Sequence, residues 1–182
     1  MKNQIILLLL TFFSISTPGI AQCEFSVNDD GEYEYEEIIN LEEKVSSKDL
    51  YNAALLSMSK IFNSVDNVIE IQNEEAGYIV GKFTTVSSPF TMGMWKSYFK
   101  FSVRLDFKES KYRILINYLS HYATSGKADC SCPNGLTTEK CGASCVPRAL
   151  WRKQCCEAHE NILFMVDDLK ELIKENSMDN EW

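Results

Sequence analysis

The sequence predicts an α+β domain, in which helices cover one face of an antiparallel sheet of about five strands. Three observations support this fold class. Residues 99–107 alternate strictly between apolar and polar side chains, as a strand does when only one of its faces is buried. Residues 47–64 and the chain from about Pro147 instead carry apolar side chains at the 3.6-residue spacing of amphipathic helices. Such helices must cover the apolar face of the sheet, which makes a two-layer domain.

Ahead of the domain, residues 1–21 have the pattern of a secretory signal peptide. Lys2 precedes an apolar run at 5–16, which is too short for a membrane span of roughly 20 residues. Small residues at Gly19 and Ala21 place the cleavage site before Gln22. We therefore expect an exported chain in which residues 22–33 form a polar tether.

Cys23 gives this N-terminal region an alternative reading. Ile20 and Ala21 suit a lipobox that ends at Cys23, whereas Gln22 does not, because a small residue is wanted directly before the cysteine. Lipidation would leave an even number of cysteines for pairing. Conventional cleavage is the prediction, and a lipid anchor on Cys23 is its alternative. No apolar run of 18 or more residues follows, so we expect no transmembrane span.

The domain itself opens with a strand and a helix. Residues 34–41 are rich in strand-forming residues and alternate in part. Ser46 and Ser47 offer an N-cap for the helix at 47–64, and Asp49 follows Ser46 at the spacing of a capping box. The expected contacts from this helix to the sheet are Tyr51 and Leu55.

Four further strands are predicted before the cysteine-rich part of the chain. The segments at 67–73 and 78–86 form a hairpin, in which Gly77 supplies the left-handed conformation of the turn. Gly81 indicates a bulge or close backbone packing. The last two strands are 99–107 and 111–122. The element order is then β-α-β-β-β-β-α, in a single domain at 34–175 with a cysteine-rich insert at 123–147.

Several short motifs in the middle of the chain carry a family resemblance. They are KDLYNAAL in the predicted helix, the strand NVIEI, the turn NEEAG and the sequence IVGK that enters the next strand. Together with KFSVRLDFKESKYRILINYL, they resemble the exported bacterial proteins of domain of unknown function 4468, over residues 34–122. The resemblance implies a TBP-like fold, that is, a curved antiparallel sheet with helices on one face. It implies no activity and no catalytic residue.

Six of the seven cysteines lie within residues 129–156. Export to an oxidising compartment favours disulfides, and the insert has few large apolar residues with which to order itself. Because adjacent cysteines pair only with strain, we expect Cys155 or Cys156 to join Cys130 or Cys132, which leaves Cys23 lipidated or free. The cysteines assigned to three disulfides are Cys130, Cys132, Cys141, Cys145, Cys155 and Cys156.

Two other uses of the cysteines stay open. A zinc site would use Cys141, Cys145, Cys156 and His159, although the C-x-C pair is too tight to be typical of zinc. A redox site would need C-x-x-C, which the sequence lacks. We therefore assign no metal ligand and no cofactor.

Charge and motifs narrow the function only slightly. The formal net charge of −8 makes nucleic acid an unsuitable partner. The sequence contains none of the catalytic or nucleotide-binding motifs G-x-S-x-G, H-E-x-x-H and Walker A. His121 is expected at an exposed strand end. The acidic run at 32–37 lacks the residue spacing of a calcium-binding loop. The prediction is an exported protein of the bacterial envelope, periplasmic or at the cell surface, that acts as a non-catalytic binding or interaction module. Its partner is an unknown envelope protein or ligand, and the alternative is an envelope hydrolase without a known motif.

Overall fold

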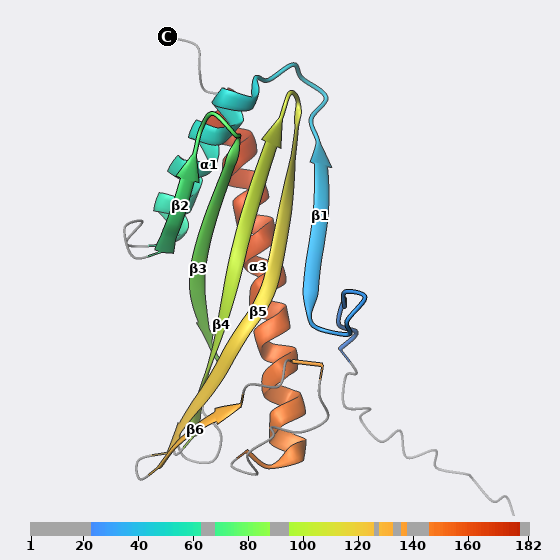
Figure 1. The fold of residues 1–182 in the computed structure, drawn as a ribbon, viewed down its shortest axis with the longest axis vertical. Helices are drawn as coiled ribbons and strands as arrows, with labels where there is room; N and C mark the ends of the chain where they lie inside the picture. Colours follow the sequence, from blue (N-terminus) through green and yellow to red (C-terminus); the bar gives the residue numbers. More distant parts are fainter. Residues whose placement is uncertain are drawn as a thin grey trace, which may run out of the picture.

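In this computed structural model, the described residues are 23–62, 68–87, 95–125, 128–132, 136–137 and 146–178. They form an antiparallel sheet and two helices, α1 and α3, which both lie behind the same face of the sheet (Figure 1). The predicted α+β class, with helices on one face only, is therefore confirmed. Within these residues no helix is long and apolar enough to cross a membrane.

The sheet has six strands. Their bounds are β1 Glu34–Asn40, β2 Ile69–Asn73, β3 Tyr78–Val86, β4 Trp95–Lys108, β5 Lys111–Ser125 and β6 Ala128–Cys132. The order across the sheet is β1-β5-β4-β3-β2, and β6 also pairs with β5. β1 pairs with residues 111–117 of β5 and β6 with residues 121–125, so both strands lie along one side of β5 at its opposite ends.

β6 is a strand that the sequence did not predict. It falls inside the segment assigned to the cysteine-rich insert, and its sequence ADCSC is short and contains no β-branched or aromatic residue, the types that favour strands. The strand forms because β5 runs on to Ser125, beyond its predicted end, and offers its backbone groups to the returning chain. The pairing partner, rather than local strand propensity, decides the conformation here.

The two helices follow their predicted positions closely. α1 spans Ser47–Ile61, and the hydroxyl oxygen of Ser46 accepts a hydrogen bond from the backbone N–H of Asp49 at 3.1 Å, which confirms Ser46 as the N-cap. The Asp49 carboxylate accepts from the Ser46 hydroxyl at 2.6 Å, in place of the reciprocal backbone bond of a capping box. The helix ends before residue 64 because Phe62 leaves helical geometry. α3 spans Arg148–Met178.

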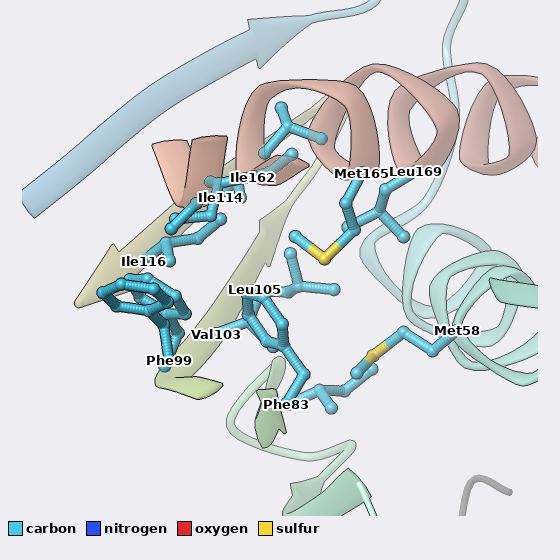
Figure 2. Packing of buried hydrophobic residues seen from close by; sticks show 14 of the residues in the cluster. Met58, Phe83, Phe99, Val103, Leu105, Ile114, Ile116, Ile162, Met165 and Leu169 are labelled. Atoms are coloured by element: carbon cyan, nitrogen blue, oxygen red, sulfur yellow. The ribbon is translucent and has the colours of Figure 1, made fainter. Parts of the chain in front are cut away.

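The core lies between the sheet and the helices. All five apolar residues of the alternating strand are buried, as predicted: Phe99, Phe101, Val103, Leu105 and Phe107. Figure 2 shows several of them against Met58 of α1 and against Ile162, Met165 and Leu169 of α3. Tyr51 is buried as expected, but Leu55 is only partly buried. The deepest contacts of α1 come from Leu50 and Met58, because the apolar stripe faces the sheet about one residue to the side of Leu55.

Two glycines have the backbone roles expected of them. Gly77 has a φ of +68°, and a Cβ atom there would lie 3.0 Å from the carbonyl oxygen of Phe107. At Gly81 a Cβ atom would lie 2.9 Å from the carbonyl oxygen of Val68, where the pairing of β2 with β3 shifts register. Both positions exclude larger residues for steric reasons.

A register shift in β5 changes which of its side chains are buried. Lys100 of β4 pairs with Ser120, but Phe101 pairs with Tyr118, so Leu119 is the extra residue of a bulge. Tyr112, Ile114 and Ile116 face the core before the bulge, and His121 and Ala123 face it afterwards. His121 is thus buried instead of exposed at a strand end.

The segment expected to be a tether is part of the folded domain from Cys23 onward. Val27 pairs with Tyr33, and the backbone N–H of Glu34 donates to the carbonyl oxygen of Ser26 at 3.1 Å. Tyr33 is fully buried, with its ring against Phe101. The polar composition of residues 24–33 hides this packing, because the turn exposes most of its side chains and only the aromatic ones reach the core.

Candidate functional site

A groove of about 400 Å³ lies between the end of β1 and the last turns of α3. Its apolar lining comes from both sides: Ile39, Leu41, Val45, Tyr112 and Met178. Val45 and Tyr112 are buried side chains and form part of the core, whereas Ile39 and Leu41 are only partly covered. Binding sites are typically concave, mostly apolar and supplied with a few polar groups, and the groove has this composition.

The fold leaves this groove open because α1 covers the other half of the sheet. α1 packs beside α3 and over β4, whereas β1 pairs with β5 at the edge of the sheet (Figure 1). The inner side of β1 faces α3, as the contact of Glu37 with Lys170 shows. After Asn40 the chain leaves the sheet and crosses to the N-cap of α1 through residues 41–45, which form one wall of the groove.

Lys170 forms the polar end of the groove, and side chains outside the lining hold it in place. The hydroxyl of Tyr35 donates to Oε2 of Glu37 at 2.6 Å, and Nζ of Lys170 donates to Oε1 of the same carboxylate at 2.8 Å. Lys170 also lies 3.5 Å from Asp167. Partial burial acts to raise the pKa of the Glu37 carboxyl, but the hydrogen bonds and charge of Lys170 outweigh it, so this pKa lies below its usual range. The hydrogen bond to Glu37 likewise raises the pKa of Lys170, and both groups stay charged.

The rim of the groove is mostly acidic. Glu42 and Glu43 stand on the connection after β1, and Glu171 stands on α3 opposite them; all three are exposed. Lys174 is the exposed basic residue among them. The last turn of α3 carries no basic residue, so the partial negative charge of the helix C-terminus adds to the acidic rim.

The uncovered face of the sheet carries charges that pair with one another. Asp106 receives hydrogen bonds from Arg104 at 2.9 Å and from Arg113 at 2.7 Å, and Arg113 also reaches Glu36 at 3.2 Å. Burial acts to raise the pKa of Asp106, but these two arginines hold it below its usual range. Arg104 in turn lies over the ring of Tyr78, at 4.7 Å from its centroid. This face therefore carries paired charges together with further exposed lysines, Lys100 and Lys108 among them.

Both histidines lie in the interior, at a distance from the groove lining. Rings of Phe99 and Trp151 stand 4.6 Å and 4.8 Å from the ring of His121, whose burial lowers its pKa to about 4. Nδ1 of His159 shares a 3.0 Å hydrogen bond with the hydroxyl of Tyr33, and burial lowers the pKa of His159 as well. Each histidine is thus a neutral residue of an aromatic cluster.

The cysteines differ from the predicted pairing wherever the structure describes their side chains. Cys23 forms a disulfide with Cys156, with their Cα atoms 5.6 Å apart, and Cys155 is a buried thiol. In this structure, therefore, neither Cys155 nor Cys156 is joined to Cys130 or Cys132, and the sulfur of Cys23 is not a free thiol. The lipid anchor on Cys23 stays an alternative prediction. The reason is the return of the N-terminal segment, in which Phe25 packs on His159, one helical turn from Cys156.

The other cysteine predictions concern residues whose side chains lie outside the described part of the structure. Cys141 and Cys145 lie outside the described residues, and of Cys130 and Cys132 only the backbone is described. Their disulfides remain a prediction. Among the residues described, no three side chains of His, Cys, Asp or Glu gather as metal ligands. The sulfur of Cys156 is committed to Cys23 and Nδ1 of His159 to Tyr33, so these two do not fit the zinc alternative.

Sequence reasoning missed the groove and its polar end. The acidic run at 32–37 is not a simple solvated strand end, because Glu37 points inward to Lys170, and Glu34 and Glu36 pair with Asn117 and Arg113. One signal was present in the sequence: Tyr33, Tyr35, Glu37 and Ile39 share one face by alternation, so Glu37 had to face the helices. No local pattern pointed to Lys170 as its partner.

Comparisons with known proteins agree with the observed fold. The sequence model described as "Domain of unknown function (DUF4468) with TBP-like fold" matches residues 35–122. None of the curated proteins matches the chain. A solved TBP-like protein from Parabacteroides distasonis superposes with a TM-score of 0.62 at 11% identity, over 81% of this chain and 96% of that one.

A second solved structure makes the same connection. A DUF4468 family protein from Bacteroides ovatus superposes with a TM-score of 0.53 at 15% identity, over 78% of this chain and 88% of that one. At such identities the likeness shows the fold alone. The match at 35–122 covers β1 through most of β5, the part of the chain whose motifs carried the resemblance. Residues 35–122 of this chain therefore belong to the family of domain of unknown function 4468, with the TBP-like fold.

Proposed function

We propose that this protein is an exported, non-catalytic binding module of the bacterial envelope, and that the groove between β1 and α3 is its ligand site. The export part of the proposal rests on the signal-peptide pattern of residues 1–21. A disulfide between Cys23 and Cys156 supports it, since disulfides persist in oxidising compartments such as the periplasm.

The observation that carries the binding part is the composition of the groove. Partly covered apolar side chains, Ile39 and Leu41, remain open to solvent beside a fixed ion pair, Glu37 with Lys170. An ion pair held in place by Tyr35 offers a ligand a preorganised polar end, and the apolar wall offers area to bury. The rest of the apolar inner face of β1 already packs against the core.

The same geometry favours binding over hydrolysis. General acid–base catalysis needs a titratable group within hydrogen-bond reach of the reacting atom. Of the residues that line the groove, Lys170 has its charged form stabilised by Glu37, while His121 and His159 sit among aromatic rings in the interior. No observation on this chain favours the hydrolase reading over a binding module.

Site-specific photocrosslinking tests the proposal. The full chain is expressed in an exporting bacterium with a photoreactive amino acid at Glu43, on the groove rim, and in a matched control at Glu75, on the β2–β3 turn at the other edge of the sheet. We expect a discrete adduct from position 43 only, which mass spectrometry then identifies. Adducts that are absent, or equal at both positions, contradict the assignment of the groove as a ligand site.

A further inference from the structure

β1 is an edge strand whose outer backbone groups have a definite direction. The N–H of Leu41 donates to the carbonyl oxygen of Ser110 at 2.8 Å, so Leu41 bonds toward the β5 side of the sheet. Backbone groups alternate in direction along an antiparallel strand, and those of Asn40, Ile38 and Glu36 therefore point away from the sheet. The bond from Glu34 N–H to Ser26 confirms this direction at the start of the strand.

The N-terminal segment of the chain already pairs with the first residues of this edge. Residues 26 and 27 pair beside Glu34 and Tyr33, at the first step of the edge. Beyond that step, no described residue forms a backbone hydrogen bond with the outward groups of Glu36, Ile38 or Asn40. An open row of this kind is a ready site for an added strand.

The groove lies directly inside the open part of this edge. Ile39 and Leu41 line it on the side that faces α3, while Ile38 is exposed on the opposite face of the sheet. Side chains of an added strand would point alternately to these two sides. Every second side chain would enter the groove, where an apolar side chain can be buried against Ile39, Leu41 and Met178.

The charge around the groove selects a basic partner. Three rim carboxylates, Glu42, Glu43 and Glu171, stand with the C-terminus of α3, whereas the charge of Lys170 is taken up by Glu37 and Asp167. Lys174 offsets part of this acidity. The charge of the whole chain, −8, has the same sign and would attract a cationic partner at long range.

A second copy of the chain fits this edge poorly. β1 carries Glu34, Glu36 and Glu37, so pairing two β1 strands would bring carboxylates together across the junction. Like charges that face each other across paired strands are destabilising. The edge is therefore better suited to a different chain that supplies the opposite charge.

From these observations we propose that β1 binds an extended peptide segment of basic and apolar residues as an added strand, with apolar side chains in the groove and a basic side chain beside Glu42, Glu43 and Glu171. This rests on the proposed function and names its ligand class. The ligand gains main-chain hydrogen bonds from the outward groups of Ile38 and Asn40. Specificity comes from the groove and its acidic rim.

Three synthetic peptides test the proposal against the processed full chain. The first, KTVTVTK, has lysine and valine on one side of an extended strand; the second, ETVTVTE, replaces both lysines with glutamate; the third is KTVTVTK with N-methyl groups on alternate backbone nitrogens. By calorimetry at low salt, we expect the first to bind about tenfold more tightly than either other peptide. The advantage over ETVTVTE should shrink at high salt because the rim charges are exposed.

Protein variants separate the contributions of backbone and charge. Asn40→Pro removes one outward N–H and leaves the bonds to β5 in place, so it should weaken KTVTVTK without lowering the thermal midpoint by more than a few degrees. Glu43→Lys should reverse the preference between the lysine and glutamate peptides. Glu75→Lys, which changes the net charge equally but does not line the groove, should leave that preference unchanged.

The outcomes distinguish this inference from the function on which it rests. Equal binding of the N-methylated peptide, equal binding of the acidic peptide, or no binding of any peptide at millimolar concentration would overturn it. If photocrosslinking at Glu43 still captures a specific molecule, the groove remains a ligand site and only the ligand class is wrong. A dimer that Asn40→Pro dissociates would assign the edge to a second copy and also overturn the inference.

Discussion

At the scale of single residues, His121 shows how one bulge changes the chemistry of a strand. Without the extra residue at Leu119, alternation from Ile114 and Ile116 would turn His121 to the solvent face. With it, the imidazole enters an aromatic cluster and is only 1% exposed. Burial opposes the charged form, and the pKa of His121 falls from 6.5 to about 4.

This lowered pKa makes stability depend on pH in a defined direction. Above pH 6.5 His121 is neutral in both the folded and the unfolded chain. Between pH 6.5 and 4 the unfolded chain binds a proton that the folded chain does not, so stability falls as the pH falls. The loss from this residue between pH 7 and 4.5 should be about 2 kcal/mol.

His121→Phe should remove that part of the pH dependence, since phenylalanine keeps the ring contacts without a proton site. The measurement is urea unfolding at pH 7 and 4.5, compared within each variant so that any change in baseline stability cancels. Tyr122→Phe, at the exposed neighbouring position, is the control and should keep the full loss. An unchanged loss in His121→Phe would mean that His121 is not the residue responsible.

Truncations on the two faces of the core should differ in size. Phe101 is fully buried between the sheet and the rings of Tyr33 and Phe83, so Phe101→Ala should cost about 3–5 kcal/mol. Leu55 is partly exposed on α1, and Leu55→Ala should cost less, about 1–2 kcal/mol. Chemical denaturation measures both, and a larger cost at Leu55 than at Phe101 would contradict the observed orientation of α1.

At the scale of elements, the disulfide fastens the N-terminal segment to the first third of α3. Cys23 and Cys156 are 133 residues apart in sequence, so the cross-link closes a long loop and restricts the unfolded chain strongly. Replacing Cys23 by serine should therefore lower the free energy of unfolding by about 2–5 kcal/mol.

The location of the effect is a second readout of this prediction. In Cys23→Ser, amide exchange should speed up at residues 24–33, while the amides of β3 and β4 keep their relative protection, because the core between the sheet and α1 contains no cysteine. The comparison is with Ser26→Ala, a change in the same segment that keeps the disulfide. A variant as stable as the parent chain would show that Cys23 is not cross-linked.

Local sequence patterns were enough to predict most helices and strands. They failed where contacts between distant parts of the chain determine the conformation. The alternation at 99–107, the cap at Ser46 and the glycine at the β2–β3 turn each report on their own neighbours, and each prediction from them is correct. β6, the bulge at Leu119 and the packing of residues 23–33 all depend on partners far along the chain. The spacing of apolar residues along the chain reports on local structure only, so it does not identify those partners.

Dependence on long-range contacts also explains why the candidate site could not be predicted from the sequence. Its lining joins residues 39–45 to Tyr112 and to residues 170–178, and none of these segments carries a recognisable motif. The side on which Glu37 faces follows from alternation, but its ion pair with Lys170 joins residues 133 positions apart. The structure places β1 beside α3, and this placement brings Glu42 and Glu43 opposite Glu171 on one rim.

At the scale of the whole molecule, the fold links the N-terminal processing of the chain to its cross-linking. Cys23 is the second residue after the expected cleavage site, which lies before Gln22. A thioether to a lipid and a disulfide to Cys156 use the same sulfur atom, so one mature chain cannot carry both. The segment that bears Cys23 is also packed on the domain through Phe25 and Tyr33, which would draw a lipid anchor toward α3.

We therefore expect the mature protein from its native host to begin at Gln22, without a lipid, and to contain the Cys23–Cys156 bridge. Intact mass spectrometry reads the N-terminus, and non-reducing peptide mapping should join the peptide of Cys23 to that of Cys156 while leaving Cys155 as an unmodified thiol. Burial raises the pKa of the Cys155 thiol, so alkylation of this residue should require unfolding. A diacylglycerol mass on Cys23 would overturn both the cleavage site and the cross-link. A retained Met1 would instead overturn the export on which the proposed function rests.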